Sequence, residues 1–223
     1  MNVTYGSSDD LAMPFRARLI VAALSMILVC LGPALGEARP VQLVAFGDSL
    51  TAGYLLPQDQ ALPAVIERLL KAKGLDVAVA NGGVSGDTTA DGLSRIDWTI
   101  PDGTDGVILA LGANDMLRGL DPAIPRANLT AIMQRLKERH IAILLVGMRA
   151  PANYGATYVE AFDGIYPELA TRFGAPLYPF LLEGVTGKPD LLLTDGLHPN
   201  PVGVNIIAQK MLPIIEAFVA KLR

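Results

Sequence analysis

Cysteine and histidine are scarce in this chain of 223 residues, which contains only Cys30, His140 and His198. One cysteine cannot form an internal disulfide, and so few thiol and imidazole groups exclude a zinc site built from Cys and His. Lysine and arginine form no cluster, and the formal net charge is -4. The sequence therefore lacks the basic patch that nucleic-acid binding needs, and we expect no metal site and no nucleic-acid partner.

Charged residues are also few, at 18% of the chain, whereas apolar residues make up 51%. That balance excludes an intrinsically disordered chain. The length suits one domain with a sizeable core, and no repeat or low-complexity linker follows Arg39. We therefore predict a single domain over residues 39–223.

The amino-terminal apolar run is too short for a comfortable membrane span. It covers 13 residues, 19–31, with Arg16 and Arg18 just before it and small residues after it. A basic flank, a short apolar stretch and a small-residue exit are the parts of a secretory signal peptide. A membrane span needs about 20 residues. We predict a signal peptide over residues 1–38, and an uncleaved membrane anchor is the alternative.

Two details refine this prediction. Acidic residues stand before Met13, so Met13 is a better start for a signal peptide than Met1. Cleavage is expected between Gly36 and Ala38, which would also remove the one cysteine. The mature protein should then be exported, periplasmic or secreted, and have no stable membrane anchor.

Short apolar runs alternate with helical periodicity along the rest of the chain. This alternation predicts a parallel β-sheet covered by helices on both faces, an α/β fold. Binding sites in such sheets lie beyond the carboxyl ends of the strands. The predicted strands are Val41–Phe46, Val77–Ala80, Gly106–Leu111, Ile141–Val146 and Leu177–Leu182, and the predicted helices cover residues 60–73, a segment starting at Asp121-Pro122, residues 157–172 with a kink at Pro167, and a segment after Pro201.

The first strand is followed by Gly47, Asp48 and Ser49. Glycine allows a sharp turn, and Ser49 would then begin a helix, where partial positive charge favours a developing anion. A serine nucleophile would suit this position. The alternative is an ordinary pair of residues that cap a helix.

Two further segments follow strands. Residues 81–87 contain Gly86 and other glycines that can turn backbone N–H groups toward a ligand, although a plain glycine-rich turn has the same composition. Asn114 follows the third strand, where its side-chain amide could donate to an oxyanion. A turn with Asn114 in the left-handed conformation is the alternative.

Asp195 and His198 are three residues apart in a loop that precedes the last helix. This spacing lets the carboxylate reach the Nδ1 side of the imidazole. The alternative is a helix-capping aspartate beside a surface histidine. His140, between a helix and a strand, is more typical of a structural residue.

A serine hydroxyl needs a base, the base needs an orienting group, and the tetrahedral oxyanion needs donors. The four segments supply each role once. Their joint occurrence favours nucleophilic catalysis far more than any one of them does.

Five motifs carry a resemblance to a known family. They are FGDSLTAGY at 46–54, NGGVSGDT at 81–88, LGANDMLRG at 111–119, RAPANYG at 149–155 and TDGLHPN at 194–200. By these motifs the chain resembles the SGNH hydrolases, specifically the periplasmic lysophospholipase, thioesterase and arylesterase group, from about Val41 to the carboxyl terminus.

The resemblance implies a flavodoxin-like three-layer α/β/α sandwich with a five-stranded parallel sheet, and no cofactor. Ser49, Gly86, Asn114 and His198 match the four residues that name the family, and Asp195 matches the triad acid. The expected oxyanion hole comprises the backbone N–H groups of Ser49 and Gly86 and the Asn114 amide.

We therefore expect a monomeric serine hydrolase that cleaves small esters and thioesters. Apolar residues in the flanking loops, Met116, Leu117, Pro151 and Tyr154, are the candidate substrate-binding residues, and Met116 is expected to shape the pocket. A carbohydrate or cell-wall O-acetyl esterase using the same catalytic residues is the alternative. A catalytically silent flavodoxin-like binding module is a third reading.

Overall fold

The computed structural model describes residues 1–2 and 39–223, so the signal peptide predicted over residues 1–38 lies almost wholly outside the described residues. Pro40–Arg223 forms one compact unit. Its centre is a five-stranded sheet in the order β2-β1-β3-β4-β5 with every pair parallel. The strands are β1 Val41–Gly47, β2 Val77–Gly83, β3 Gly106–Ala110, β4 Ala142–Val146 and β5 Leu177–Tyr178.

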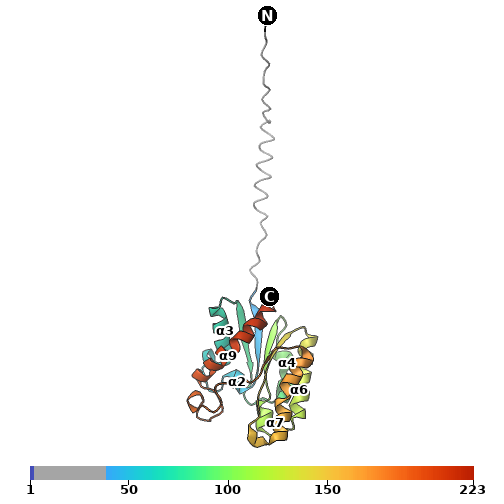
Figure 1. Cartoon of the computed structure of the whole chain (residues 1–223), viewed down its shortest axis with the longest axis vertical. Helices are drawn as coiled ribbons and strands as arrows, with labels where there is room; N and C mark the ends of the chain where they lie inside the picture. The colour runs from blue at the N-terminus through green and yellow to red at the C-terminus, as the bar shows by residue number, and fades with distance from the viewer. Residues whose placement is uncertain (3–38) are drawn as a thin grey trace. The chain divides into compact units, whose positions relative to one another are not determined.

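Helices cover both faces of the sheet, with α3 and α9 on one side and α4 and α6 on the other (Figure 1). The fold is thus the predicted three-layer α/β/α sandwich. The longer helices are α3 Leu62–Ala72, α4 Thr89–Thr99, α6 Ala123–Glu138, α7 Ala156–Asp163, α8 Ile165–Phe173 and α9 Pro201–Ala220, and the two short helices that follow strands are α2 Ser49–Ala52 and α5 Ala113–Leu117. Short 3₁₀ turns occupy Gln58–Gln60, Ala152–Tyr154 and Pro189–Leu191.

The central strands are apolar because helices bury them from both sides. All five residues of β3 are buried, and so are the last five of β1. The two edge strands differ most from the prediction. β2 runs three residues further, to Gly83, because its end pairs with the end of β1. β5 covers only two residues, since Pro179 follows and has no N–H to continue the ladder.

The helix predicted over residues 157–172 is broken rather than kinked. It forms α7 and α8, which meet at Gly164, three residues before Pro167. Pro167 cannot donate a hydrogen bond to the carbonyl of Asp163, and its ring crowds that carbonyl. The interruption therefore falls one turn ahead of the proline.

The last helix, α9, is long and apolar enough to cross a membrane by length and composition alone. Its inward face, however, belongs to the core of the domain and packs against α3. The buried residues include Val204, Ile207, Met211, Ile215 and Phe218. Its apolar character is therefore explained by its place in the sandwich.

Candidate active site

Ser49 is the first residue of α2, a single helical turn directly after β1. The Asp48 carboxylate caps that turn by accepting from the Leu50 N–H at 3.0 Å. Gly47 does not supply the sharp turn expected of it, because it is the last residue of the strand. It supplies space instead. A Cβ there would lie 2.1 Å from Thr51 Oγ1.

His198 lies beside Ser49 although the two residues are 149 apart in sequence. Its Nε2 is 2.8 Å from Ser49 Oγ, and its Nδ1 is 2.7 Å from Asp195 Oδ2. The other Asp195 oxygen accepts the backbone N–H groups of Leu197 and His198 at 2.9 and 3.0 Å. Serine, imidazole and carboxylate therefore form a continuous chain of contacts.

The loop that carries Asp195 and His198 is held by hydrogen bonds between its two ends. The Leu193 N–H donates to the His198 carbonyl at 2.7 Å, and Leu192 pairs with Pro199 in an isolated antiparallel bridge. Asn200 then caps α9 through its side chain. Local hydrogen bonds thus fix the position of Asp195 relative to His198.

These contacts also fix the charge of Asp195. The backbone N–H groups of His198 and Leu197, with the His198 side chain, lower the pKa of the Asp195 carboxyl to about 2. Asp195 therefore stays ionised over the working range of most enzymes and can only accept hydrogen bonds. The proton between the Asp195 carboxylate and the His198 imidazole must therefore reside on Nδ1 of His198. This leaves the lone pair of Nε2 facing Ser49.

Asn114 is helical, within α5, so the left-handed alternative is wrong; the left-handed residue is Gly112, with φ of 117°. The Asn114 Nδ2 donates one N–H to the Asp87 carbonyl at 2.9 Å. An amide nitrogen has two N–H groups, so a second remains. In the described part of the chain no hydrogen bond uses the N–H of Ser49 or Gly86.

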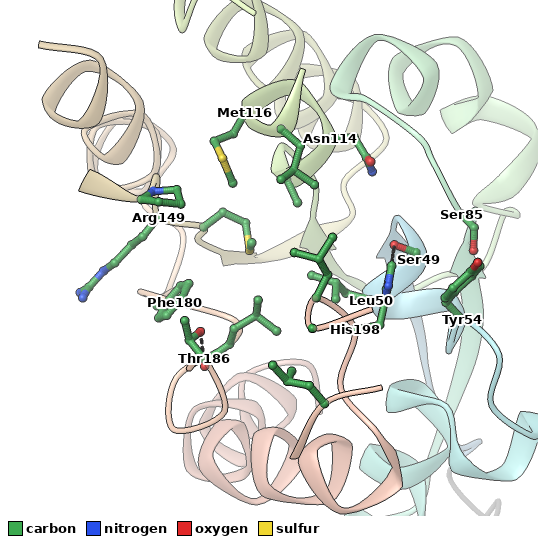
Figure 2. A pocket seen from close by; sticks show the side chains of 18 of the residues that line it. Ser49, Leu50, Tyr54, Ser85, Asn114, Met116, Arg149, Phe180, Thr186 and His198 are labelled. Carbon is green, nitrogen blue, oxygen red and sulfur yellow. Dashed lines mark hydrogen bonds between the residues drawn. The ribbon is translucent and has the colours of Figure 1, made fainter. Parts of the chain in front are cut away.

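A cavity of about 320 Å³ extends from Ser49 and is lined mainly by apolar side chains. Figure 2 shows Ser49, His198 and Tyr54 at one end and Arg149 and Phe180 at the other. Its apolar lining comprises Leu50, Ala113, Met116, Leu117, Met148, Pro151, Phe180, Leu182, Leu192 and Leu197.

The structure places three of the four predicted substrate-binding residues in this cavity, namely Met116, Leu117 and Pro151. Tyr154 is not among the lining residues. Its ring lies tilted against the Tyr158 ring, with centroids 5.2 Å apart, and it lines a separate hollow. It follows Pro151 in a 3₁₀ turn that directs it away from the cavity.

Two further residues, Tyr54 and Asp48, lie beside His198 and Ser49 and were not predicted as site residues. The Tyr54 ring lies 4.5 Å from the His198 ring between centroids; it belongs to the same motif as Ser49. Asp48 is only 2% exposed, and burial raises the pKa of its carboxyl to about 6. Nothing in the sequence indicates that an aspartate in a polar motif is buried.

Comparison with known proteins shows the family to which the chain belongs. The GDSL-like Lipase/Acylhydrolase family matches residues 45–206. An arylesterase of Vibrio mimicus is 38% identical over 191 residues, which cover 85% of this chain and 95% of that protein. The thioesterase 1/protease 1/lysophospholipase L1 of Escherichia coli K12 is 38% identical over 179 residues, covering 78% and 85%.

A solved structure indicates the same family. AlinE4, described as an SGNH-hydrolase family esterase, is 46% identical and superposes with a TM-score of 0.68 over 82% of this chain and 98% of its own. The family match covers the end of β1, strands β2 to β5 and every residue that lines the cavity. The chain therefore belongs to the GDSL-like lipase/acylhydrolase family and is a carboxylic ester hydrolase.

Proposed function

We propose that this hydrolase acts on esters and thioesters through an acyl-enzyme formed on Ser49. The observation that carries the proposal is the line of contacts from Asp195 through His198 to Ser49. Nε2 takes the hydroxyl proton as Ser49 Oγ attacks the carbonyl carbon. The resulting imidazolium is stabilised by the Asp195 carboxylate.

The developing oxyanion needs donors that are already in place. The N–H groups of Ser49 and Gly86 and the second N–H of the Asn114 amide meet this need in the proposal. When the tetrahedral intermediate collapses, Nε2 returns its proton to the departing alkoxide or thiolate. A water then attacks the acyl group, again with His198 as base, and regenerates Ser49.

The cavity supports small apolar acyl or aryl groups as the part of the substrate that is bound. Each buried CH₂ contributes about 0.8 kcal/mol until the groove ends. Catalytic efficiency should therefore rise over the first acyl carbons and then level or fall. Aryl esters should react well because phenolate is a good leaving group, and thioesters form the same oxyanion. The protein is proposed to act as a monomer.

The test compares acetyl, butyryl and octanoyl esters of one phenol, using wild type and Ser49→Ala. Wild type should favour the longer chains over acetyl, and Ser49→Ala should lose nearly all activity while its circular dichroism is unchanged. A fluorophosphonate should label Ser49 in the wild type. Labelling of another serine, with loss of activity, would refute the assignment. A strict preference for acetyl groups on sugars would favour the O-acetyl esterase alternative instead.

We also propose that the chain is exported after removal of residues 1–38. The basic flank, short apolar run and small-residue exit support this. The compact unit begins at Pro40 and the family match at residue 45, so cleavage at this point would leave the catalytic domain whole.

A further inference from the structure

Arg95 lies in the second turn of α4 and is 7% exposed, which is unusual for a charged side chain. Its Nε donates to Asp87 Oδ2 at 2.6 Å, and the Asp87 side chain is also largely buried. The guanidinium carbon stands 4.1 Å above the centre of the Phe46 ring. A buried cation thus has a carboxylate partner and an aromatic face, as the interior of a protein requires.

The rest of the guanidinium binds two backbone carbonyls and, through Nη1, the Thr99 hydroxyl at 3.3 Å. Nη2 donates to the Gly47 carbonyl at 2.8 Å, and Nη1 donates to the Gly82 carbonyl at 2.9 Å. Gly47 is the last residue of β1, two residues before Ser49, and Gly82 lies at the end of β2. The planar fork of arginine spreads its N–H groups over three nitrogens and can hold two carbonyls and a carboxylate placed around it. Lysine has its three N–H groups on one nitrogen, which does not match acceptors spread in this way.

Asp87 connects this cluster to the oxyanion donors. Its side chain is bound by Arg95, and its backbone carbonyl accepts from the Asn114 amide. It is also the neighbour of Gly86 in sequence. The proposed donors therefore come from three separate segments of the chain. The buried Arg95 side chain contacts the segments that carry Ser49 and Gly86, and Asp87 links it to the Asn114 amide.

We propose that Arg95 is a positioning residue for ester hydrolysis. It holds the strand end that carries Ser49 and the loop that carries Gly86 in one geometry, and through Asp87 it sets the direction of the Asn114 amide. The inference rests on the proposed serine mechanism. It predicts a loss in turnover and little change in substrate affinity, because the cluster does not line the cavity.

The test measures kcat and KM for wild type, Arg95→Lys, Asn114→Ala and the double variant. Arg95→Lys keeps the charge beside Asp87 but cannot hold both carbonyls. Small misplacement of a catalytic group costs up to about 100-fold, so kcat should fall roughly 10- to 100-fold while KM changes little. In the Asn114→Ala background the same substitution should cost much less, because part of its effect passes through Asn114.

The matched control is Ile96→Val. Ile96 is buried next to Arg95 on α4, and its apolar side chain makes no hydrogen bond to the strand ends or loops that Arg95 binds. It should weaken folding slightly, as loss of a buried methyl group does, and leave kcat unchanged. If Arg95→Lys has the kcat of this control, or if its effect is the same with and without Asn114, the proposal is wrong.

A second variant covers the case in which Arg95→Lys does not fold. Replacing Arg95 by Met together with Asp87 by Leu removes both charges, and apolar replacement of a buried ion pair is often tolerated. A folded double variant with wild-type kcat would overturn the proposal, and one with low kcat and unchanged KM would support it. Fluorophosphonate labelling distinguishes failure of the Arg95 proposal from failure of the serine mechanism on which it rests. Absence of label on Ser49 in the wild type would refute the serine mechanism itself.

Discussion

The substitution Asp195→Asn tests the proposed role of Asp195 as the triad acid, because the structure determines how the new amide must orient. The Oδ1 position accepts two backbone N–H groups, from Leu197 and His198. An amide oxygen can take that place, but an amide NH₂ cannot. The NH₂ group must then face Nδ1 of His198, where it donates a hydrogen bond. Nδ1 becomes an acceptor, and the ring proton moves to Nε2, which can no longer take the proton of Ser49.

The size of the effect follows from these bonds. To recover the working tautomer, the amide must flip and lose both backbone hydrogen bonds, each worth about 0.5–1.5 kcal/mol. The total of about 1–3 kcal/mol corresponds to roughly 5- to 150-fold, before the loss of the carboxylate charge is included. The same substitution in a well-studied triad lowers kcat by roughly 10⁴. We therefore expect Asp195→Asn to lower kcat by roughly 10²–10⁴-fold.

The assay measures kcat on a chromogenic aryl ester for wild type, Asp195→Asn and Asp195→Ala. Alanine loses the loop hydrogen bonds that asparagine can keep, but it imposes no tautomer on His198. If tautomer control is the main role, the asparagine variant should be no more active than the alanine variant. An asparagine variant with nearly wild-type kcat would refute this reasoning and leave Asp195 a purely structural role in its loop.

Three further predictions follow. Asn114→Ala should lower kcat by roughly 10²–10³-fold with little change in KM, and unchanged kcat with raised KM would make Asn114 a binding residue only. Asp48 has a folded-state pKa of about 6, above its unfolded value of 3.8, so its ionisation destabilises the fold as pH rises through that window. Asp48→Asn, which can still accept from Leu50, should raise the free energy of urea unfolding at pH 7 by up to about 3 kcal/mol and leave it nearly unchanged at pH 4; an equal change at both pH values would contradict this. Amino-terminal sequencing of the protein from whole cells should find Glu37 or Arg39 first, and an intact signal segment would contradict export.

The sequence predicts the sheet well because its strands are buried on both faces and read as continuous apolar runs. Helix α4 was not predicted. It contains Gly92 and several polar residues, and Ile96 is the one apolar side chain among its buried residues. A helix with so narrow an apolar stripe resembles a loop when only periodicity is read.

The candidate site divides in the same way. Ser49, Asn114 and His198 each follow a strand or precede a helix in a recognisable motif, and the parallel topology brings such positions to one edge. Arg95 and Asp87 could not be assigned, because a charged residue in a polar segment is normally on the surface. Their burial depends on contacts with the ends of two strands, which no local pattern reveals.

Ser49, the proposed nucleophile, and His198, its proposed base, are 149 residues apart in sequence, and this has a consequence for folding. The loop with Asp195 and His198 is organised by its own hydrogen bonds, so the contact between these two residues can form early in folding. Contact with Ser49 requires that α9 pack against α3, which joins the last part of the domain to the first. Recovery of hydrolysis during refolding therefore reports the contact between residues 149 apart in sequence, and it will come later than any signal that reports helix formation alone.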